Sequence, residues 1–71
     1  MPINDAIAIL KEKIPNRTVK AYAKVEDGYI LILNDNFDTI GCNYYKVTND
    51  KKVLPTNPAL CKLNNYRIKM L

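Results

Sequence analysis

The sequence predicts an α+β fold: an N-terminal helix packed on a three- to four-stranded antiparallel sheet, with a short C-terminal helical turn or strand. Residues 3–14 carry apolar side chains at helical spacing. Residues 18–25 alternate between apolar and polar side chains, as strands do. Residues 29–33 are all apolar and follow Asp27-Gly28, a strong hairpin signal, which predicts a central strand buried on both faces.

Length and composition predict a single small α+β domain that spans residues 1–71. The 71 residues are 48% hydrophobic, which is ordinary for a globular protein with a small core. No run approaches the roughly 20 apolar residues of a membrane span, so we expect no membrane association. The N-terminal residues do not look like a signal peptide, so we expect a cytoplasmic or virion-associated protein with two free thiols, Cys42 and Cys61.

The first expected element is an amphipathic helix. Asn4 is a good N-cap, and residues 15–16, proline and asparagine, are of the kind that end a helix. Four apolar residues lie on one narrow face: Ile3, Ile7, Leu10 and Ile14. This pattern predicts a helix that lies on a flat sheet.

The next two elements form a β-hairpin around Asp27-Gly28. A two-residue turn there pairs Val25 with Ile30 and turns Ile30 and Ile32 toward the helix. A three-residue loop would exchange the two faces, because a shift of one residue reverses every side chain. The core expected from the first register comprises Ile7, Leu10, Ile14, Val19, Ala23, Val25 and Ile32.

The sequence pattern over residues 34–54 predicts a loop and two further strands. Residues 34–41 are rich in Asn and Asp and are expected to form the loop. Alternation over 43–48 predicts a third strand, with a turn over 49–52. Val53-Leu54 begins a short fourth strand, which Pro55 ends.

The C-terminal segment is open to two interpretations. Asn57-Pro58 is an N-cap followed by a proline at the first helical position, which predicts a helical turn to about Leu63. Residues 66–70 then alternate like a strand. One continuous helix is the alternative, which the adjacent asparagines at 64–65 disfavour.

The sequence shows none of the motifs that mark common enzyme or metal sites. It has no histidine, which removes the usual general base and the commonest zinc ligand. Cys42 and Cys61 are too far apart for a CxxC pair and too few for a zinc site. Two glycines cannot form a phosphate-binding loop. We therefore expect no enzyme activity and no catalytic, cofactor-binding or metal-binding residues.

The sheet face opposite the helix is expected to carry more apolar surface than a solvated face needs. Leu31 and Leu33 lie there with Tyr22 and Tyr44 in the expected register. Either the C-terminal segment or another protein chain can cover this stripe. We favour self-association or a protein partner, bound through this face or the adjoining sheet edge.

Basic residues on the same expected face suggest a second kind of ligand. The net charge is +4, and Lys20, Lys24 and Lys46 alternate with tyrosines, as on sheets that bind single-stranded nucleic acid. A nucleic-acid-binding accessory protein is therefore the alternative function. The candidate interaction surface comprises Tyr22, Leu31, Leu33, Tyr44, Lys20 and Lys24.

The order of these elements resembles one half of a PepSY-type repeat. The matching pieces are the helix at 5–10, the segment 14–19, Glu26-Asp27-Gly28-Tyr29, and the strand and turn at 45–53. The resemblance implies a regulatory or protease-inhibiting binding domain. PepSY modules are typically exported, whereas we expect no export signal here, because the N-terminal residues do not look like one.

Small uncharacterised prophage proteins of low-GC bacteria also look like this sequence, so an origin in a phage or mobile element is expected equally. The function predicted from the sequence is thus a non-enzymatic protein-interaction module, with a binding, regulatory or structural accessory role.

Overall fold

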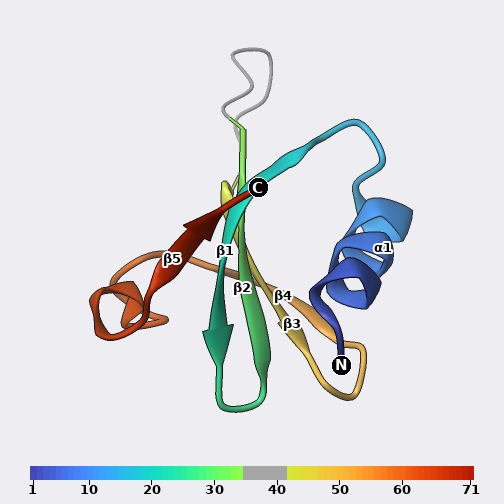
Figure 1. Ribbon diagram of the computed structural model, residues 1–71. Helices are drawn as coiled ribbons and strands as arrows, with labels where there is room; N and C mark the ends of the chain where they lie inside the picture. The colour runs from blue at the N-terminus through green and yellow to red at the C-terminus, as the bar shows by residue number, and fades with distance from the viewer. Residues whose placement is uncertain (35–41) are drawn as a thin grey trace.

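One helix and a five-stranded antiparallel sheet make up the computed structural model, which describes residues 1–34 and 42–71 (Figure 1). The elements follow in the order α1 Ile3–Lys13, β1 Val19–Val25, β2 Gly28–Leu33, β3 Tyr44–Thr48, β4 Val53–Thr56, the 3₁₀ turn η1 Leu63–Asn65 and β5 Ile68–Met70. The strand order is β4-β3-β2-β1-β5, so β4 and β5 form the two edges.

This architecture confirms the α+β prediction. The sheet has one strand more than expected because the C-terminal segment forms both a helical turn and a strand. The predicted loop at 34–41 lies outside the described residues, apart from Asn34. The helix begins two residues earlier than expected, with Pro2 rather than Asn4 at the N-cap position.

The β1–β2 hairpin turns at Glu26-Asp27 rather than at Asp27-Gly28. Val25 pairs with Gly28, so the register differs by two residues from the predicted pairing with Ile30. A shift of two leaves every side chain on its predicted face, because side chains alternate with a period of two. From Ala21 to Leu33 the grouping of residues by face is therefore right, although the turn is wrong.

Gly28 is required where the hairpin meets β3. A Cβ atom at this position would lie 2.0 Å from the carbonyl oxygen of Val47 and 2.8 Å from the Cα of Thr48. These are backbone atoms, which cannot rotate away as a side chain can. Only a glycine therefore allows β2 to approach β3 this closely.

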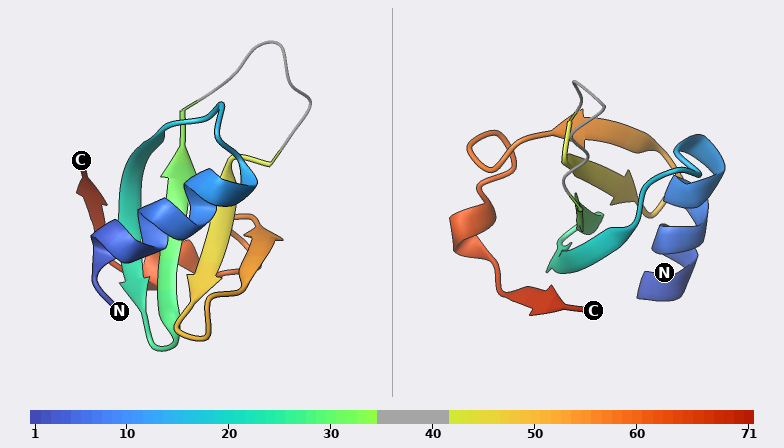
Figure 2. Two further views of the ribbon diagram at one scale, coloured as in Figure 1. Left: turned by 90° about the vertical axis from the view of Figure 1, so that its right-hand side faces the viewer. Right: turned by 90° about the horizontal axis from the view of Figure 1, so that it is seen from above.

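The helix packs on the face opposite to the predicted one. Leu31 and Leu33 are 0% and 1% exposed and lie in one cluster with Ala6 and Leu10 of α1. Figure 2 shows α1 crossing this face of the sheet, over β1, β2 and β3. Both faces of the hairpin are apolar, so the alternation of side chains groups the residues without deciding which group the helix covers.

An irregularity in β1 moves one predicted core residue to the other face. The register of β1 against β2 shifts between Val19 and Ala21. Val19 packs in the helix-side cluster, whereas Ala21 and Ala23 pack on the opposite face. Lys20 is the extra residue of this bulge, and an extra residue reverses the alternation on one side of it. The predicted core is therefore divided between two clusters.

The C-terminal segment covers the second face of the sheet. Leu63 is buried against the side chains of that face: Ala21, Ala23, Val25, Ile30 and Ile32. Cys61 and Tyr66 pack beside it. The amide of Leu60 donates to Asn57 Oδ1 at 2.8 Å, which confirms Asn57 as the cap of this turn. Figure 1 shows this segment and α1 on opposite sides of the sheet.

Arg17 holds together the two ends of the β2–β3 connection. Its guanidinium donates to the carbonyl oxygen of Cys42 at 3.0 Å. It also donates to the carbonyl oxygen of Asn34 and to Asn43 Oδ1. One planar, forked donor therefore joins the residues that precede and follow segment 35–41.

Candidate interaction surface

Two of the six predicted surface residues lie in the core. Leu31 and Leu33 are covered by α1 and are closed to a partner in the folded protein. Their assignment to an open surface is wrong because it depended on the helix taking the other face. The apolar side chains of Leu31 and Leu33 pack against α1 instead of forming an open surface.

The remaining predicted residues lie on both sides of the sheet. Tyr44 and Lys46 pair with Ile32 and Ile30 of β2, which places them on the face that the C-terminal segment covers. Tyr22 and Lys24 lie on the helix side, while Lys20 is exposed at the bulge. The single basic and aromatic face that was predicted for nucleic acid is therefore divided into two.

Tyr22 and Lys24 line a groove between the N-terminal end of α1 and the edge strand β5. It has a volume of about 240 Å³, and its lining residues are Ile3, Tyr22, Lys24, Tyr29, Arg67 and Lys69. Three of these six are basic and none is acidic. None of the three cations forms an ion pair within the part of the chain that the structure describes.

Two packed tyrosine rings form the aromatic part of the groove. The ring centroids of Tyr22 and Tyr29 are 6.0 Å apart, with an edge-to-face angle of 68°. The Tyr29 hydroxyl donates to the carbonyl oxygen of Met1 at 2.9 Å, and the Tyr29 side chain is buried. Tyr22 is half-buried. The groove therefore presents one partly exposed ring rather than an open aromatic platform.

The outer side of β5 carries backbone groups that no other strand pairs within residues 1–34 and 42–71. The amide of Leu71 donates inward to the carbonyl oxygen of Lys20 at 3.0 Å, and Lys69 pairs with Tyr22. Inward-facing and outward-facing backbone groups alternate along an antiparallel strand. The amides and carbonyls of Ile68 and Met70 therefore point away from β1, into the open edge.

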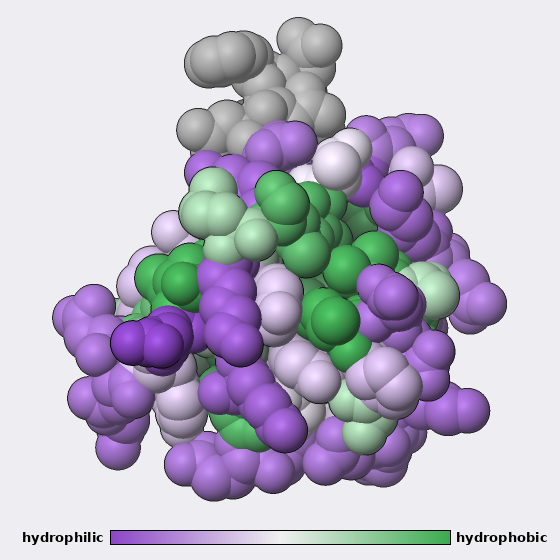
Figure 3. All heavy atoms as spheres, viewed as in Figure 1, coloured by the Kyte–Doolittle hydropathy of each residue, from purple (hydrophilic) through white to green (hydrophobic). Residues whose placement is uncertain are grey.

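The side chains of β5 are divided by chemistry between its two faces. Arg67 and Lys69 lie on the groove side. Ile68 and Met70, paired with Ala23 and Ala21, lie on the other face and are 47% and 72% exposed. Figure 3 shows hydrophobic side chains gathered around the C-terminal end of the chain, with hydrophilic ones beside them. β5 is thus an open, amphipathic edge strand.

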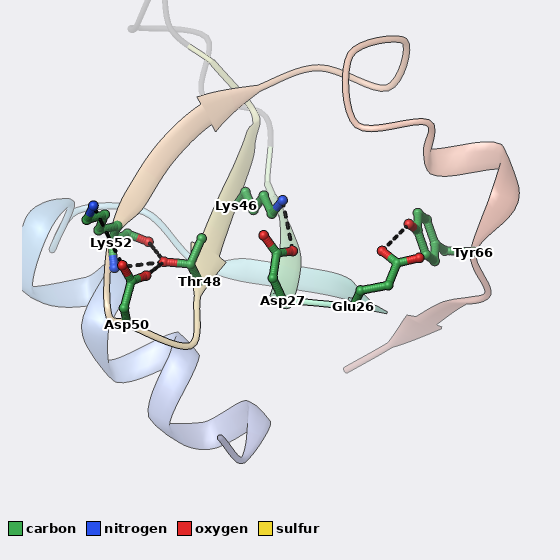
Figure 4. Close-up of polar contacts among 7 residues, drawn as sticks. All are labelled: Glu26, Asp27, Lys46, Thr48, Asp50, Lys52 and Tyr66. Carbon is green, nitrogen blue, oxygen red and sulfur yellow. Dashed lines mark hydrogen bonds and ion pairs between the residues drawn. The ribbon is translucent and has the colours of Figure 1, made fainter.

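A hydrogen bond anchors the C-terminal segment to the hairpin turn. The Tyr66 hydroxyl donates to Glu26 Oε2 at 2.7 Å (Figure 4). This hydrogen bond lowers the pKa of the Glu26 carboxyl and raises the pKa of Tyr66. On the same turn, Lys46 Nζ lies 2.9 Å from Asp27 Oδ1 and, through this hydrogen bond, lowers the pKa of Asp27. Both turn carboxylates therefore have partners.

Sequence reasoning missed Arg67 and Lys69 as members of this surface. Their alternation with Ile68 and Met70 predicts a strand, and that strand is confirmed. The alternation places Arg67 and Lys69 on one face of this strand. It does not place them in the groove unless one also knows that β5 pairs with β1 beside Tyr22. Nothing in the local sequence specifies that long-range pairing.

The described residues offer no metal cluster and no membrane-crossing helix. Across residues 1–34 and 42–71, no three His, Cys, Asp or Glu side chains come together as a metal site would require. Within the same ranges, no helix has the length and apolar character to cross a membrane. Comparison with family models, curated proteins and solved structures finds no match to this chain. The resemblance to a PepSY-type repeat stays a prediction.

Proposed function

We propose that this protein is a non-enzymatic interaction module that binds an extended segment of a partner protein along the open edge of β5. One observation carries the proposal: the backbone groups of Ile68 and Met70 point outward beside their own exposed apolar side chains. Strand addition uses these two elements, since backbone hydrogen bonds supply affinity and alternate side chains supply specificity.

The opposite edge of the sheet provides a contrast. β4 contains Pro55, which lacks an amide hydrogen and is a residue that natural proteins place in edge strands. β5 has no proline. It exposes two apolar side chains on one face, Ile68 and Met70, whereas β4 exposes one, Leu54. The short length of β5 and Lys69 do limit unspecific pairing. An edge that is short and partly charged suits selective binding of one segment rather than aggregation.

Single-stranded nucleic acid is the second candidate ligand, because the groove places Tyr22 beside three cations. Binding of single strands relies on stacking successive bases on exposed aromatic rings. Tyr29 is buried and bonded to Met1, so Tyr22 alone is open for stacking in this groove. The groove therefore supports nucleic-acid binding less well than β5 supports strand addition.

A proline at position 70 tests the proposal. Met70→Pro removes an outward-facing amide and leaves the inward hydrogen bonds of Lys69 and Leu71 to form. We expect it to abolish binding of a peptide of about eight alternating valine and serine residues, a length typical of a strand. Met70→Ala is the matched control. It keeps the amide, so it should weaken binding only through its shorter side chain and not abolish it.

The readout is amide hydrogen exchange of residues 68 and 70, measured by NMR with and without the peptide. In the unaltered protein the peptide should slow exchange at both positions, and Met70→Ala should preserve protection at position 68. If the peptide leaves these exchange rates unchanged, or if Met70→Pro binds as well as the unaltered protein, strand addition at β5 is excluded.

A further inference from the structure

We infer that the partner segment is acidic: its side chains alternate between carboxylates, which face the groove, and apolar residues, which face Ile68 and Met70. This inference rests on the proposed strand addition at β5. It adds the chemistry of the partner, which neither the fold nor the open edge specifies.

Charge in the groove is the first argument. Lys24, Arg67 and Lys69 line it without an acidic neighbour among the lining residues. The two acids of the nearby hairpin turn have other partners, since Glu26 accepts from Tyr66 and Asp27 pairs with Lys46. The positive charge of the groove is therefore left for a ligand to neutralise.

The alternation of β5 is the second argument. A strand added beside β5 continues its two faces, so every second side chain of the partner lies beside Arg67 and Lys69. The other side chains of the partner lie beside Ile68 and Met70, which are exposed and apolar. Opposite charges on one face and apolar pairs on the other both favour binding. A partner with alternating acidic and apolar residues satisfies both faces together.

A second copy of this chain fits the same edge poorly. When β5 pairs antiparallel with itself over its whole length, Lys69 of one copy lies directly opposite Lys69 of the other. Like charges placed opposite each other in a sheet are unfavourable. In the register centred on Ile68, Arg67 lies opposite Lys69, which repeats the problem. The charges of β5 therefore disfavour self-association through this edge and favour an acidic partner.

Three peptides that differ only in their alternating polar residue test the inference: valine–glutamate, valine–serine and valine–lysine. Fluorescence anisotropy at low salt measures their affinities. We expect the glutamate peptide to bind about three- to tenfold more tightly than the serine peptide, and the lysine peptide to bind most weakly. The advantage of glutamate should shrink as salt rises, because salt screens exposed charges.

Charge reversal supplies the matched control. Lys69→Glu should remove most of the advantage of the glutamate peptide over the lysine peptide, because it places a carboxylate beside the two remaining cations. Lys62→Glu, an exposed change away from the groove lining, should preserve that advantage. Thermal melting shows whether each variant is folded. Sedimentation without peptide compares the association state of the unaltered protein with that of Lys69→Glu. We expect the substitution to leave the association state unchanged.

The outcomes separate the inference from the proposal on which it rests. If the glutamate and serine peptides bind equally and both slow amide exchange at residues 68 and 70, the inference of an acidic partner is wrong. Strand addition at β5 is then still supported. Failure of all three peptides to bind overturns both. Binding of an oligodeoxythymidylate by a protein that ignores the peptides overturns both and assigns the groove to nucleic acid.

Discussion

The hydrogen bond between Tyr66 and Glu26 makes stability depend on pH in a predictable direction. The bond lowers the pKa of the Glu26 carboxyl in the folded protein. A carboxyl whose pKa is lower folded than unfolded stabilises the fold at neutral pH, and that contribution is lost as the pH falls through the folded pKa. The pKa values of Asp27 and Asp50 are also lowered, because Lys46 donates a hydrogen bond to Asp27 and Thr48 donates one to Asp50. These two carboxylates therefore also stabilise the fold at neutral pH and lose that contribution on acidification.

We therefore predict that the melting temperature falls on acidification below about pH 5, where such carboxylates begin to be protonated. Tyr66→Phe removes the largest cause of the Glu26 shift, so this variant should lose less stability between pH 7 and pH 4 than the unaltered protein. Tyr45→Phe, a tyrosine of the other face, is the control and should keep the full loss. An unchanged pH dependence in Tyr66→Phe would show that the hydrogen bond contributes nothing in solution.

The helix α1 depends on Leu10 for its attachment to the sheet. Leu10 is 2% exposed and packs in the cluster that contains Leu31 and Leu33. Leu10→Ala should lower the free energy of unfolding by about 2–5 kcal/mol, as large-to-small changes in a core do. Lys11→Ala, one residue further along the same helix and exposed, should change it by less than about 0.5 kcal/mol. Urea denaturation measures both, and equal midpoints would show that α1 does not pack through Leu10.

The strands and helix could be predicted because each is encoded locally. Alternation placed Tyr22 with Leu31 and Ala23 with Ile30 on shared faces, and the structure confirms both groupings. The face that α1 covers could not be predicted, since both faces of the hairpin are apolar and the helix lies on one of them. The bulge at Lys20 could not be predicted either, because it depends on how β1 pairs rather than on the residue itself.

In the candidate site, too, the features that are encoded locally could be predicted, and those that depend on long-range strand pairing could not. Alternation predicts that Tyr22 and Lys24 share a face, because they lie two residues apart on one strand, and both line the groove. Arg67 and Lys69 complete the groove from a strand more than forty residues away, brought there by pairing with β1. Long-range pairing is set by the whole packed structure, which local periodicity does not encode.

In the molecule as a whole, the two ends of the chain cover the two faces of one sheet. α1 packs on the face of Leu31 and Leu33, and the segment that contains Leu63 packs on the other. Of the two covers expected for the face opposite to the helix, the C-terminal segment or another protein chain, the structure has the C-terminal segment. Together, α1 and this segment leave both edges of the sheet open in the described residues, β4 with its Pro55 and β5 with the basic groove beside it, and we propose that binding occurs at β5.

The C-terminal segment contributes Leu63 to the core of the protein. Leu63 is 5% exposed and Leu60, three residues earlier, is 75% exposed. Leu63→Ala should lower the free energy of unfolding by about 2–5 kcal/mol, because it leaves a cavity over Ala21 and Ala23. Leu60→Ala should change it by less than about 0.5 kcal/mol.

Urea denaturation followed by circular dichroism compares these two variants in one segment. If the second face is covered as the structure has it, Leu63→Ala alone should also speed hydrogen exchange in β1, because it loosens the segment that leads into β5 and covers Ala21 and Ala23. Equal stability of the two variants would mean that this segment does not cover the sheet. In that case the apolar second face would again need another chain to cover it.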